Sequence, residues 1–157
     1  GEAGELLLKA PTVTPGYWRN PEATAKTIVD GWFHTGDLVK RDQDGFYYVV
    51  DRIKNMYISG GENVYPAEVE HLIRNIPEIS DVAIIDVPHE KWGETGLAFV
   101  VTVEGSEISE NEIIEYCLKN LAKYKIPSRV MFIDTLPLNN AGKVDKKKLK
   151  ALYNESE

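Results

Sequence analysis

The chain has 157 residues, of which 43% are hydrophobic and 27% are charged, and its formal net charge at pH 7 is -7. This composition is typical of a folded globular protein, and its acidic balance argues against a general nucleic-acid or anionic-membrane binder. The single cysteine, Cys117, excludes an internal disulfide framework and no apolar run approaches a membrane span, so we expect a cytoplasmic protein with no transmembrane segment.

Residues 1–53 are expected to be rich in strands. An apolar run predicts a strand from Glu5 to Lys9. A short helix is predicted from Glu22 to Val29, because Asn20 is a good N-cap and Pro21 suits the first helical position. The sequence also opens without a methionine and enters the first strand almost at once, which suggests a start within a longer protein.

A hairpin is predicted next, formed by residues 37–41 and 46–50. Its connection, Asp42-Gln43-Asp44-Gly45, ends in the Asp-Gly pair that favours a tight turn. Because little helix is available to cover the sheet, we expect this part of the chain to be the strand-rich end of a larger N-terminal domain.

Residues 54–157 are predicted to form a more self-sufficient domain. A helix is expected to begin at Pro66, and apolar β-branched runs predict strands over residues 81–87 and 96–103. The residues expected to share the buried face of this helix are Val69, Leu72, Ile73 and Ile76.

The rest of this domain is predicted to add a helix, a strand and a final helix. Ser109 and Glu112 form a capping-box pattern, residues 129–134 suit a strand, and Asp145 can cap a helix that runs to about Leu152. The order of elements predicts an α+β fold, a small three-layer domain with helices packed on a short sheet. The inner face of the helix after Ser109 is expected to hold Ile113, Ile114, Cys117, Leu118 and Leu121.

Two short motifs in the first part of the chain suit a nucleotide. In Thr35-Gly36-Asp37 a carboxylate follows a glycine turn, so it is able to accept hydrogen bonds from a ribose diol, although a turn-capping aspartate is the simpler explanation. In Asp51-Arg52 the planar guanidinium can donate to a ribose or a phosphate, whereas the alternative is an ordinary surface ion pair.

Three further motifs lie in the second part. Ser59-Gly60-Gly61 is either a plain loop or a place where a ligand approaches the backbone closely. Trp92 lies in a predicted turn, where it either covers the edge of the sheet or contacts a ligand. Gly142-Lys143 precedes a basic helix and is either a solvated turn or a mobile cation that reaches a reacting phosphate.

In their order and spacing, these motifs resemble the adenylate-forming enzymes over essentially the whole chain. The sequence Ser59-Gly60-Gly61-Glu62-Asn63 is most similar to acyl-CoA synthetases, that is, fatty-acid–CoA ligases. The resemblance implies the C-terminal portion of such an enzyme, in which Asp37 and Arg52 bind the nucleotide. It also implies that Lys54 is the hinge between the N-terminal domain and a mobile C-terminal AMP-binding-enzyme domain.

The same resemblance implies a catalytic residue and a CoA site. Lys143 matches the lysine that catalyses adenylation in the family, where it stabilises charge on the carboxylate and the α-phosphate. No residue of this chain is expected to bind a metal. The residues implied to contact CoA or to line its pantetheine tunnel are Gly60, Gly61, Trp92, Tyr124 and Lys125.

The implied reaction uses ATP with Mg²⁺, a small-molecule carboxylic acid and CoA, with ATP and Mg²⁺ held mostly by the N-terminal domain. A medium- or long-chain fatty acid fits the wording best, and an aryl-CoA ligase or a carrier-protein-loading adenylation domain is the alternative. A non-catalytic interaction domain with the same fold is a further alternative, as is nucleic-acid binding through Lys146-Lys147-Lys148, which the acidic total disfavours. By itself, the chain is expected to fold but not to catalyse.

Overall fold

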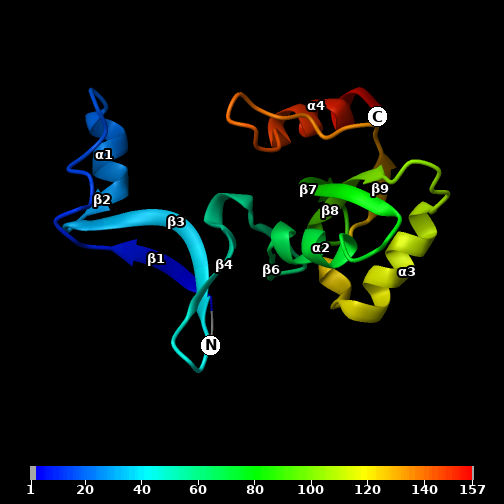
Figure 1. The fold of residues 1–157 in the computed structure, drawn as a ribbon, viewed down its shortest axis with the longest axis horizontal. Helices are drawn as coiled ribbons and strands as arrows, with labels where there is room; N and C mark the ends of the chain where they lie inside the picture. The colour runs from blue at the N-terminus through cyan, green and yellow to red at the C-terminus, as the bar shows by residue number, and fades with distance from the viewer. Residues whose placement is uncertain (1–2, 157) are drawn as a thin grey trace. The chain divides into compact units, whose positions relative to one another are not determined.

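The computed structural model describes residues 3–156, so the first two residues of the predicted 1–53 domain, and Glu157, lie outside the described part. The chain forms two compact units, Gly1–Asn55 and Met56–Glu157, which are described separately below (Figure 1). The predicted boundary after residue 53 and the hinge at Lys54 stay predictions.

The first unit is a four-stranded sheet with one short helix. Its long central strand, β3, pairs antiparallel with β1, with β2 and with β4. Among the apolar side chains of residues 3–55, only Leu38 and Val39 are buried, whereas Trp18, Phe46 and Val49 are exposed, so the core of this unit is small. The bounds of its elements are β1 Gly4–Leu8, α1 Pro21–Thr27, β2 Ile28–Val29, β3 Trp32–Arg41, β4 Tyr47–Arg52 and the 3₁₀ helix η1 Ile53–Asn55.

Helix α1 starts where its cap signals predict and ends two residues early. The Asn20 side chain accepts a hydrogen bond from the backbone N–H of Ala23, and Pro21 is the first helical residue. The predicted end at Val29 is wrong, because the β-branched residues Ile28 and Val29 pair with β3 as a strand. The predicted hairpin of β3 and β4 is confirmed.

The second unit is built on a five-stranded sheet. Strands β6, β5, β8 and β7 lie in this order with antiparallel pairing, and β9 pairs parallel with β8. The predicted order of helices and strands is confirmed, with β5 and β6 added before it. The bounds are β5 Tyr57–Ser59, β6 Glu62–Val64, α2 Pro66–Ile73, β7 Ile79–His89, β8 Gly93–Thr102, α3 Glu110–Asn120, η2 Lys123–Lys125, β9 Arg129–Phe132 and α4 Lys146–Ser156.

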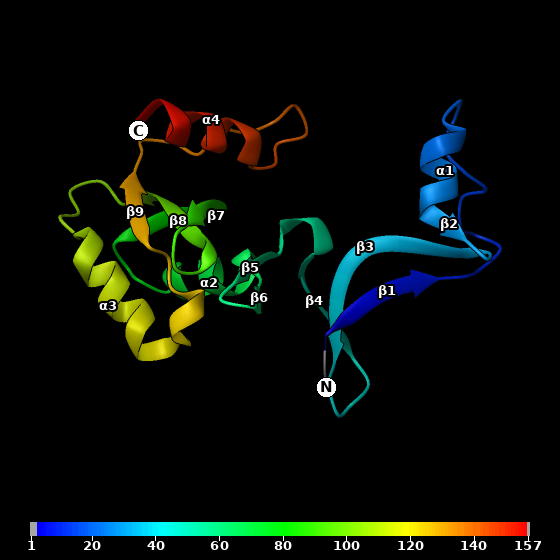
Figure 2. The same cartoon turned by 180° about the vertical axis from the view of Figure 1, so that it is seen from behind.

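The sheet of the second unit has a separate apolar core on each face, which confirms the predicted three-layer α+β fold. Helices α2 and α3 cover one face and α4 covers the other, as Figures 1 and 2 show. Alternate residues of β7 and β8 supply the two cores, as strand geometry requires. The α2/α3 core contains Val69, Ile73, Val82, Ile84, Ala98, Val100, Ile113 and Cys117, among others. The α4 core consists of Ala83, Ile85, Val87, Leu97, Phe99, Leu136 and Leu149.

Helix α3 carries the predicted capping box. The Ser109 hydroxyl accepts from the Glu112 backbone N–H, and the Glu112 carboxylate accepts from the Ser109 backbone N–H. Leu118, predicted on the inner face, is 52% exposed. It lies about 100° round the helix from the buried Cys117, which turns it toward solvent. No helix within residues 3–156 is long and apolar enough to cross a membrane.

Candidate functional site

Asp37 and Arg52, the two residues predicted to bind a nucleotide, lie opposite each other on β3 and β4. Arg52 Nη1 donates to Asp37 Oδ1 at 3.0 Å and to the carbonyl oxygen of Thr35 at 3.0 Å. The guanidinium therefore holds one carboxylate oxygen of Asp37, and a ribose diol can donate to the acceptor positions that remain.

Thr35, Gly36 and Asp37 do not form the predicted turn but lie within β3, at an irregularity in its pairing with β1. Glu5, which the sequence analysis did not single out, holds this irregular segment. Its Oε1 accepts from the Gly36 backbone N–H at 3.0 Å, and its Oε2 lies 2.9 Å from Nδ1 of His34. The hydrogen bond from His34, together with that from Gly36, holds the pKa of the Glu5 carboxyl below its ordinary value of 4.5. The only sequence signal was a lone carboxylate at the start of an apolar run.

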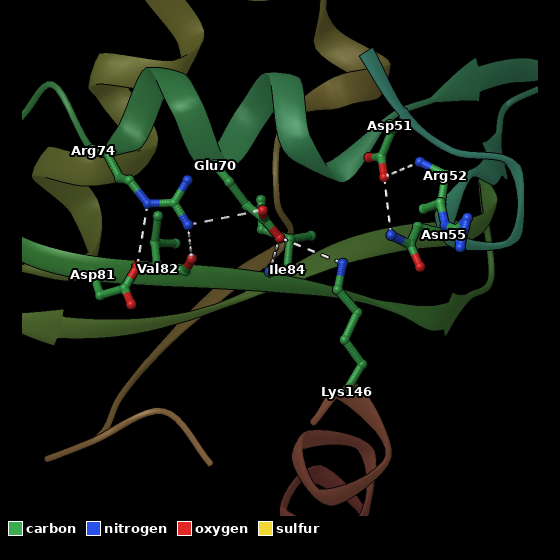
Figure 3. A network of polar contacts seen from close by, with 9 residues as sticks. All are labelled: Asp51, Arg52, Asn55, Glu70, Arg74, Asp81, Val82, Ile84 and Lys146. Atoms are coloured by element: carbon green, nitrogen blue, oxygen red, sulfur yellow. Dashed lines mark hydrogen bonds and ion pairs between the residues drawn. The ribbon is translucent and has the colours of Figure 1, made fainter. Parts of the chain in front are cut away.

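A cavity of about 390 Å³ adjoins this segment of β3. Arg52 lies on its wall, and the residue predicted to be the hinge, Lys54, follows in η1. The neighbouring Asp51 is 7% exposed and accepts from the Arg52 backbone N–H and from Asn55 Nδ2 at 2.9 Å, as Figure 3 shows. The residues that line the cavity are Glu5, Thr35, Gly36, Arg52, Ile53 and Lys54.

Gly60 and Trp92, both predicted near CoA, are in direct contact. Gly60 and Gly61 form the tip of the β5–β6 hairpin, and the Gly60 backbone N–H donates to the Trp92 carbonyl at 2.9 Å. Gly60 has a φ of +61°, and a Cβ there would lie 2.5 Å from Cε3 of the indole. Only glycine lets the backbone approach the ring this closely. Gly61 has a φ of +87° and open space where its Cβ would be.

The Trp92 turn is fixed by His89, another residue to which the sequence analysis assigned no role. Nδ1 of His89 accepts from the backbone N–H groups of Lys91 and Trp92, at 3.1 and 3.2 Å. The ammonium of Lys91 lies 4.9 Å from the centre of the Trp92 ring. The half-buried indole therefore contacts the ordered backbone at Gly60 and has the Lys91 ammonium over its ring. An adenine or a phosphate is chemically compatible with these neighbours.

Tyr124 and Lys125 lie in η2 on the α2/α3 side of the sheet, because Tyr124 packs against the core on that side. The Lys125 ammonium is held by both carboxylate oxygens of Glu68, at 2.7 and 2.8 Å. A phosphate that binds Lys125 therefore has to compete with Glu68. This acidic partner was not foreseen, because 57 residues separate the two in the chain.

Lys143 lies near the end of a small hairpin between β9 and α4. Leu138 and Val144 form an isolated antiparallel bridge, and the Asn139 backbone N–H donates to the Lys143 carbonyl at 2.8 Å. Asn139 Oδ1 accepts from the backbone N–H groups of Ala141 and Lys143. The backbone of Lys143 is therefore ordered while its side chain is exposed. The Asn-Asn-Ala-Gly wording carried this turn signal, although the sequence analysis assigned Asn139 no role.

Tyr124, one of the predicted CoA residues, and Lys143 lie toward opposite faces of the sheet. Tyr124 packs on the α2/α3 core, whereas Val144, next to Lys143, packs on the α4 core. The structure thus brings together Asp37 with Arg52 and Gly60 with Trp92. It keeps Lys143 on the far side of its own unit from Tyr124 and Lys125. Within residues 3–156, no group of three or more His, Cys, Asp or Glu side chains is placed to hold a metal ion.

Known proteins are similar to this chain both in sequence and in fold. Residues 68–143 match the family of AMP-binding enzyme C-terminal domains. A feruloyl-CoA synthase from an Amycolatopsis species is 49% identical over 144 residues, which are 92% of this chain and 29% of that protein. The long-chain-fatty-acid–CoA ligase FadD13 of Mycobacterium tuberculosis is 47% identical over 150 residues, 96% of this chain and 30% of the ligase. The crystal structure of ATP-bound MatB from Rhodopseudomonas palustris superimposes with a TM-score of 0.90 at 42% identity, covering 98% of this chain and 31% of MatB.

The fold of this chain, including the three-layer second unit, is thus shared with adenylate-forming enzymes. Residues 68–143 belong to the AMP-binding enzyme C-terminal domain family, and over almost its whole length the chain is similar to part of adenylate-forming enzymes, most of all to the CoA ligases. It spans 29% to 30% of the length of the two ligases compared. The individual roles predicted for its site residues stay predictions.

Proposed function

We propose that the chain is the C-terminal part of an ATP-dependent acyl-CoA synthetase, which activates a carboxylic acid as an acyl-adenylate and transfers the acyl group to CoA. The observation that carries the proposal is the pairing of Asp37 with Arg52 beside a cavity, in a chain that also presents Lys143 on an ordered hairpin. The first pair suits a ribose and the lysine suits developing negative charge. We place this enzyme in the cytoplasm on the ground of its composition.

In the first half-reaction, a carboxylate oxygen of the acid attacks the α-phosphorus of ATP and pyrophosphate leaves. Asp37 accepts hydrogen bonds from the ribose hydroxyls, and Arg52 keeps Asp37 oriented. Lys143 places its ammonium where charge develops on the reacting carboxylate and phosphate. When bound with ATP, Mg²⁺ supplies charge neutralisation on the departing pyrophosphate.

In the second half-reaction, the sulfur of CoA attacks the acyl carbon of the adenylate and AMP leaves. The C-terminal domain rotates about Lys54, so that the glycine hairpin replaces Lys143 at the reacting centre. Gly60 and Gly61 have no side chains to block the thiol, while Trp92, Tyr124 and Lys125 contact CoA. The location of Lys143 and Tyr124 toward opposite faces of one unit supports such alternation.

For the acid, we propose a medium- or long-chain fatty acid. An aromatic acid is the alternative, and it has specific support because a feruloyl-CoA synthase and a long-chain-fatty-acid–CoA ligase are similarly close to this chain. Acid-dependent exchange of radiolabelled pyrophosphate into ATP by the complete enzyme tests the proposal. We expect exchange with dodecanoate or palmitate and little with ferulate. The reverse preference would assign an aryl-CoA ligase, and the absence of exchange with every acid would contradict the proposed function.

A further inference from the structure

The carboxylate of Glu70 joins three elements of the second unit, as Figure 3 shows. Glu70 lies on α2, and its Oε1 accepts from the Ile84 backbone N–H of β7 at 2.8 Å and from Nζ of Lys146 on α4 at 3.4 Å. The Glu70 side chain is only 14% exposed, and that of Lys146 is 30% exposed. A largely buried carboxylate is costly without partners, and Lys146 supplies the cationic one.

The other cation near Glu70 is directed elsewhere. Arg74 Nη2 lies 4.0 Å from Glu70 Oε2, whereas it donates to the Val82 carbonyl at 2.8 Å. Arg74 Nε donates to Asp81 at 3.2 Å. The guanidinium thus has its short contacts on β7, and the shorter ion pair of Glu70 is the one that reaches α4.

Lys146 connects this contact to Lys143. It is the first residue of α4, three residues after Lys143, and the hairpin closes immediately before it through the Asp145 backbone N–H, which donates to the Pro137 carbonyl at 2.8 Å. One turn further along α4, Lys150 Nζ pairs with Asp86 of β7 at 2.6 Å. The first turns of α4 are therefore held by two ion pairs, one to α2 and one to β7, and the pair with Glu70 is the nearer to Lys143.

We propose that Glu70 is a positioning residue for Lys143: by holding Lys146, it fixes the start of α4 and thereby the orientation of the Lys143 hairpin during adenylation. The inference rests on the function proposed above. Because Lys143 is proposed to act in adenylation, we expect the contact to affect adenylation and not thioester formation.

Glu70→Gln in the complete enzyme tests this role, because the amide oxygen still accepts from Ile84 while the charge facing Lys146 is removed. We expect adenylation to slow about fivefold, the factor that corresponds to loss of one partly exposed ion pair. Thioester formation from supplied acyl-adenylate should stay within twofold. The matched control is Asp81→Asn, which removes a carboxylate paired with Arg74 and leaves α4 untouched. It should change neither half-reaction.

Lys146→Gln provides a second, independent variant. It should reproduce the effect of Glu70→Gln, and the double variant should be no slower than either single one, because both remove the same contact. Equal slowing of both half-reactions in the two single variants, additive effects, or unchanged adenylation would overturn the proposal.

Hydrogen exchange of the 157-residue chain separates this inference from the proposed function. Glu70→Gln should speed exchange of the hairpin amides of Gly142 and Asp145, with those of β8 unchanged. Unchanged hairpin exchange would overturn the positioning role. If Lys143→Ala left adenylation intact, the proposed function would fail, whereas faster hairpin exchange in Glu70→Gln would still demonstrate the structural contact.

Discussion

Gly60 is a residue whose replacement has two separable costs. Its φ of +61° disfavours any L side chain, and a Cβ would overlap the indole of Trp92 at 2.5 Å. Gly61 shares only the first cost, since its φ is +87° and no atom lies within 4 Å of the Cβ position. The two neighbouring glycines therefore form a matched pair of test sites.

Gly60→Ala is expected to displace Trp92 and to slow thioester formation by the complete enzyme at least tenfold, with adenylation changed less than twofold. Gly61→Ala should slow thioester formation much less, because the strain of a positive φ, about 1 kcal/mol, is its only defect. Rapid-quench measurement of each half-reaction checks this. Equal effects of the two variants would show that the contact with Trp92 is unimportant.

Glu5 gives the first unit a dependence on pH. Its pKa is lowered in the folded chain by the hydrogen bond from His34, so ionised Glu5 stabilises the fold above its ordinary pKa of 4.5. This contribution is lost as the pH falls below 4.5 and through the lowered folded value.

Glu5→Gln should therefore destabilise the first unit by about 1 kcal/mol at pH 7, where the charged acceptor is lost, and by less near pH 3. Urea unfolding at the two pH values, followed by the fluorescence of tryptophan residues in the first unit, measures the difference. A destabilisation that is the same at both pH values would mean that the Glu5 charge has no role in holding Gly36 and His34 of β3.

At the scale of elements, α4 depends on one buried side chain. Leu149 is 0% exposed in the core that α4 shares with β7 and β8, whereas Leu152, one turn along, is 42% exposed. Leu149→Ala should lower the free energy of unfolding by about 3 kcal/mol, the usual cost of a buried Leu-to-Ala change. Leu152→Ala should cost less than about 0.5 kcal/mol. Similar unfolding midpoints for both variants in urea would contradict the docking of α4 described here.

Elements with local start signals were predictable from the sequence. Asn20 and Pro21 mark the start of α1, and the Ser109 pattern marks α3. The sequence does not predict strands β5 and β6 on either side of Gly60 and Gly61, because each strand has three residues, too few to show alternation. Residues 28–29 were assigned to a helix, since their pairing with β3 is a tertiary contact that no local pattern reveals.

The sequence predicts the site residues that belong to motifs resembling a known family. It does not predict the residues, distant in the chain, that contact those motifs. Glu5 contacts Gly36 across 31 positions and Glu70 contacts Lys146 across 76, so neither pairing is visible in a local pattern. The close contact of Gly60 with Trp92 likewise follows from the pairing of β5 with β8. Such long-range contacts become visible only once the fold is known.

At the scale of the whole molecule, the two units differ in the size of their apolar cores. The second has two apolar cores and the first has a small one, so the chain is expected to fold around residues 56–157. When supplied with ATP, a fatty acid and CoA, the 157-residue chain should form no acyl-CoA. Because it spans only 29% to 30% of the compared ligases, we expect that it does not by itself hold acid and ATP together. Acyl-CoA production by this chain alone would refute that expectation.

In the proposed mechanism, Lys143 catalyses adenylation and has left the reacting centre when the thioester forms. The decisive variant is Lys143→Ala in the complete enzyme, with each half-reaction followed separately. We expect acid-dependent pyrophosphate exchange to fall by at least 100-fold, on the order of the loss of one electrostatic stabiliser, while thioester formation from supplied acyl-adenylate changes less than about threefold. Unimpaired pyrophosphate exchange in Lys143→Ala would show that Lys143 does not catalyse adenylation.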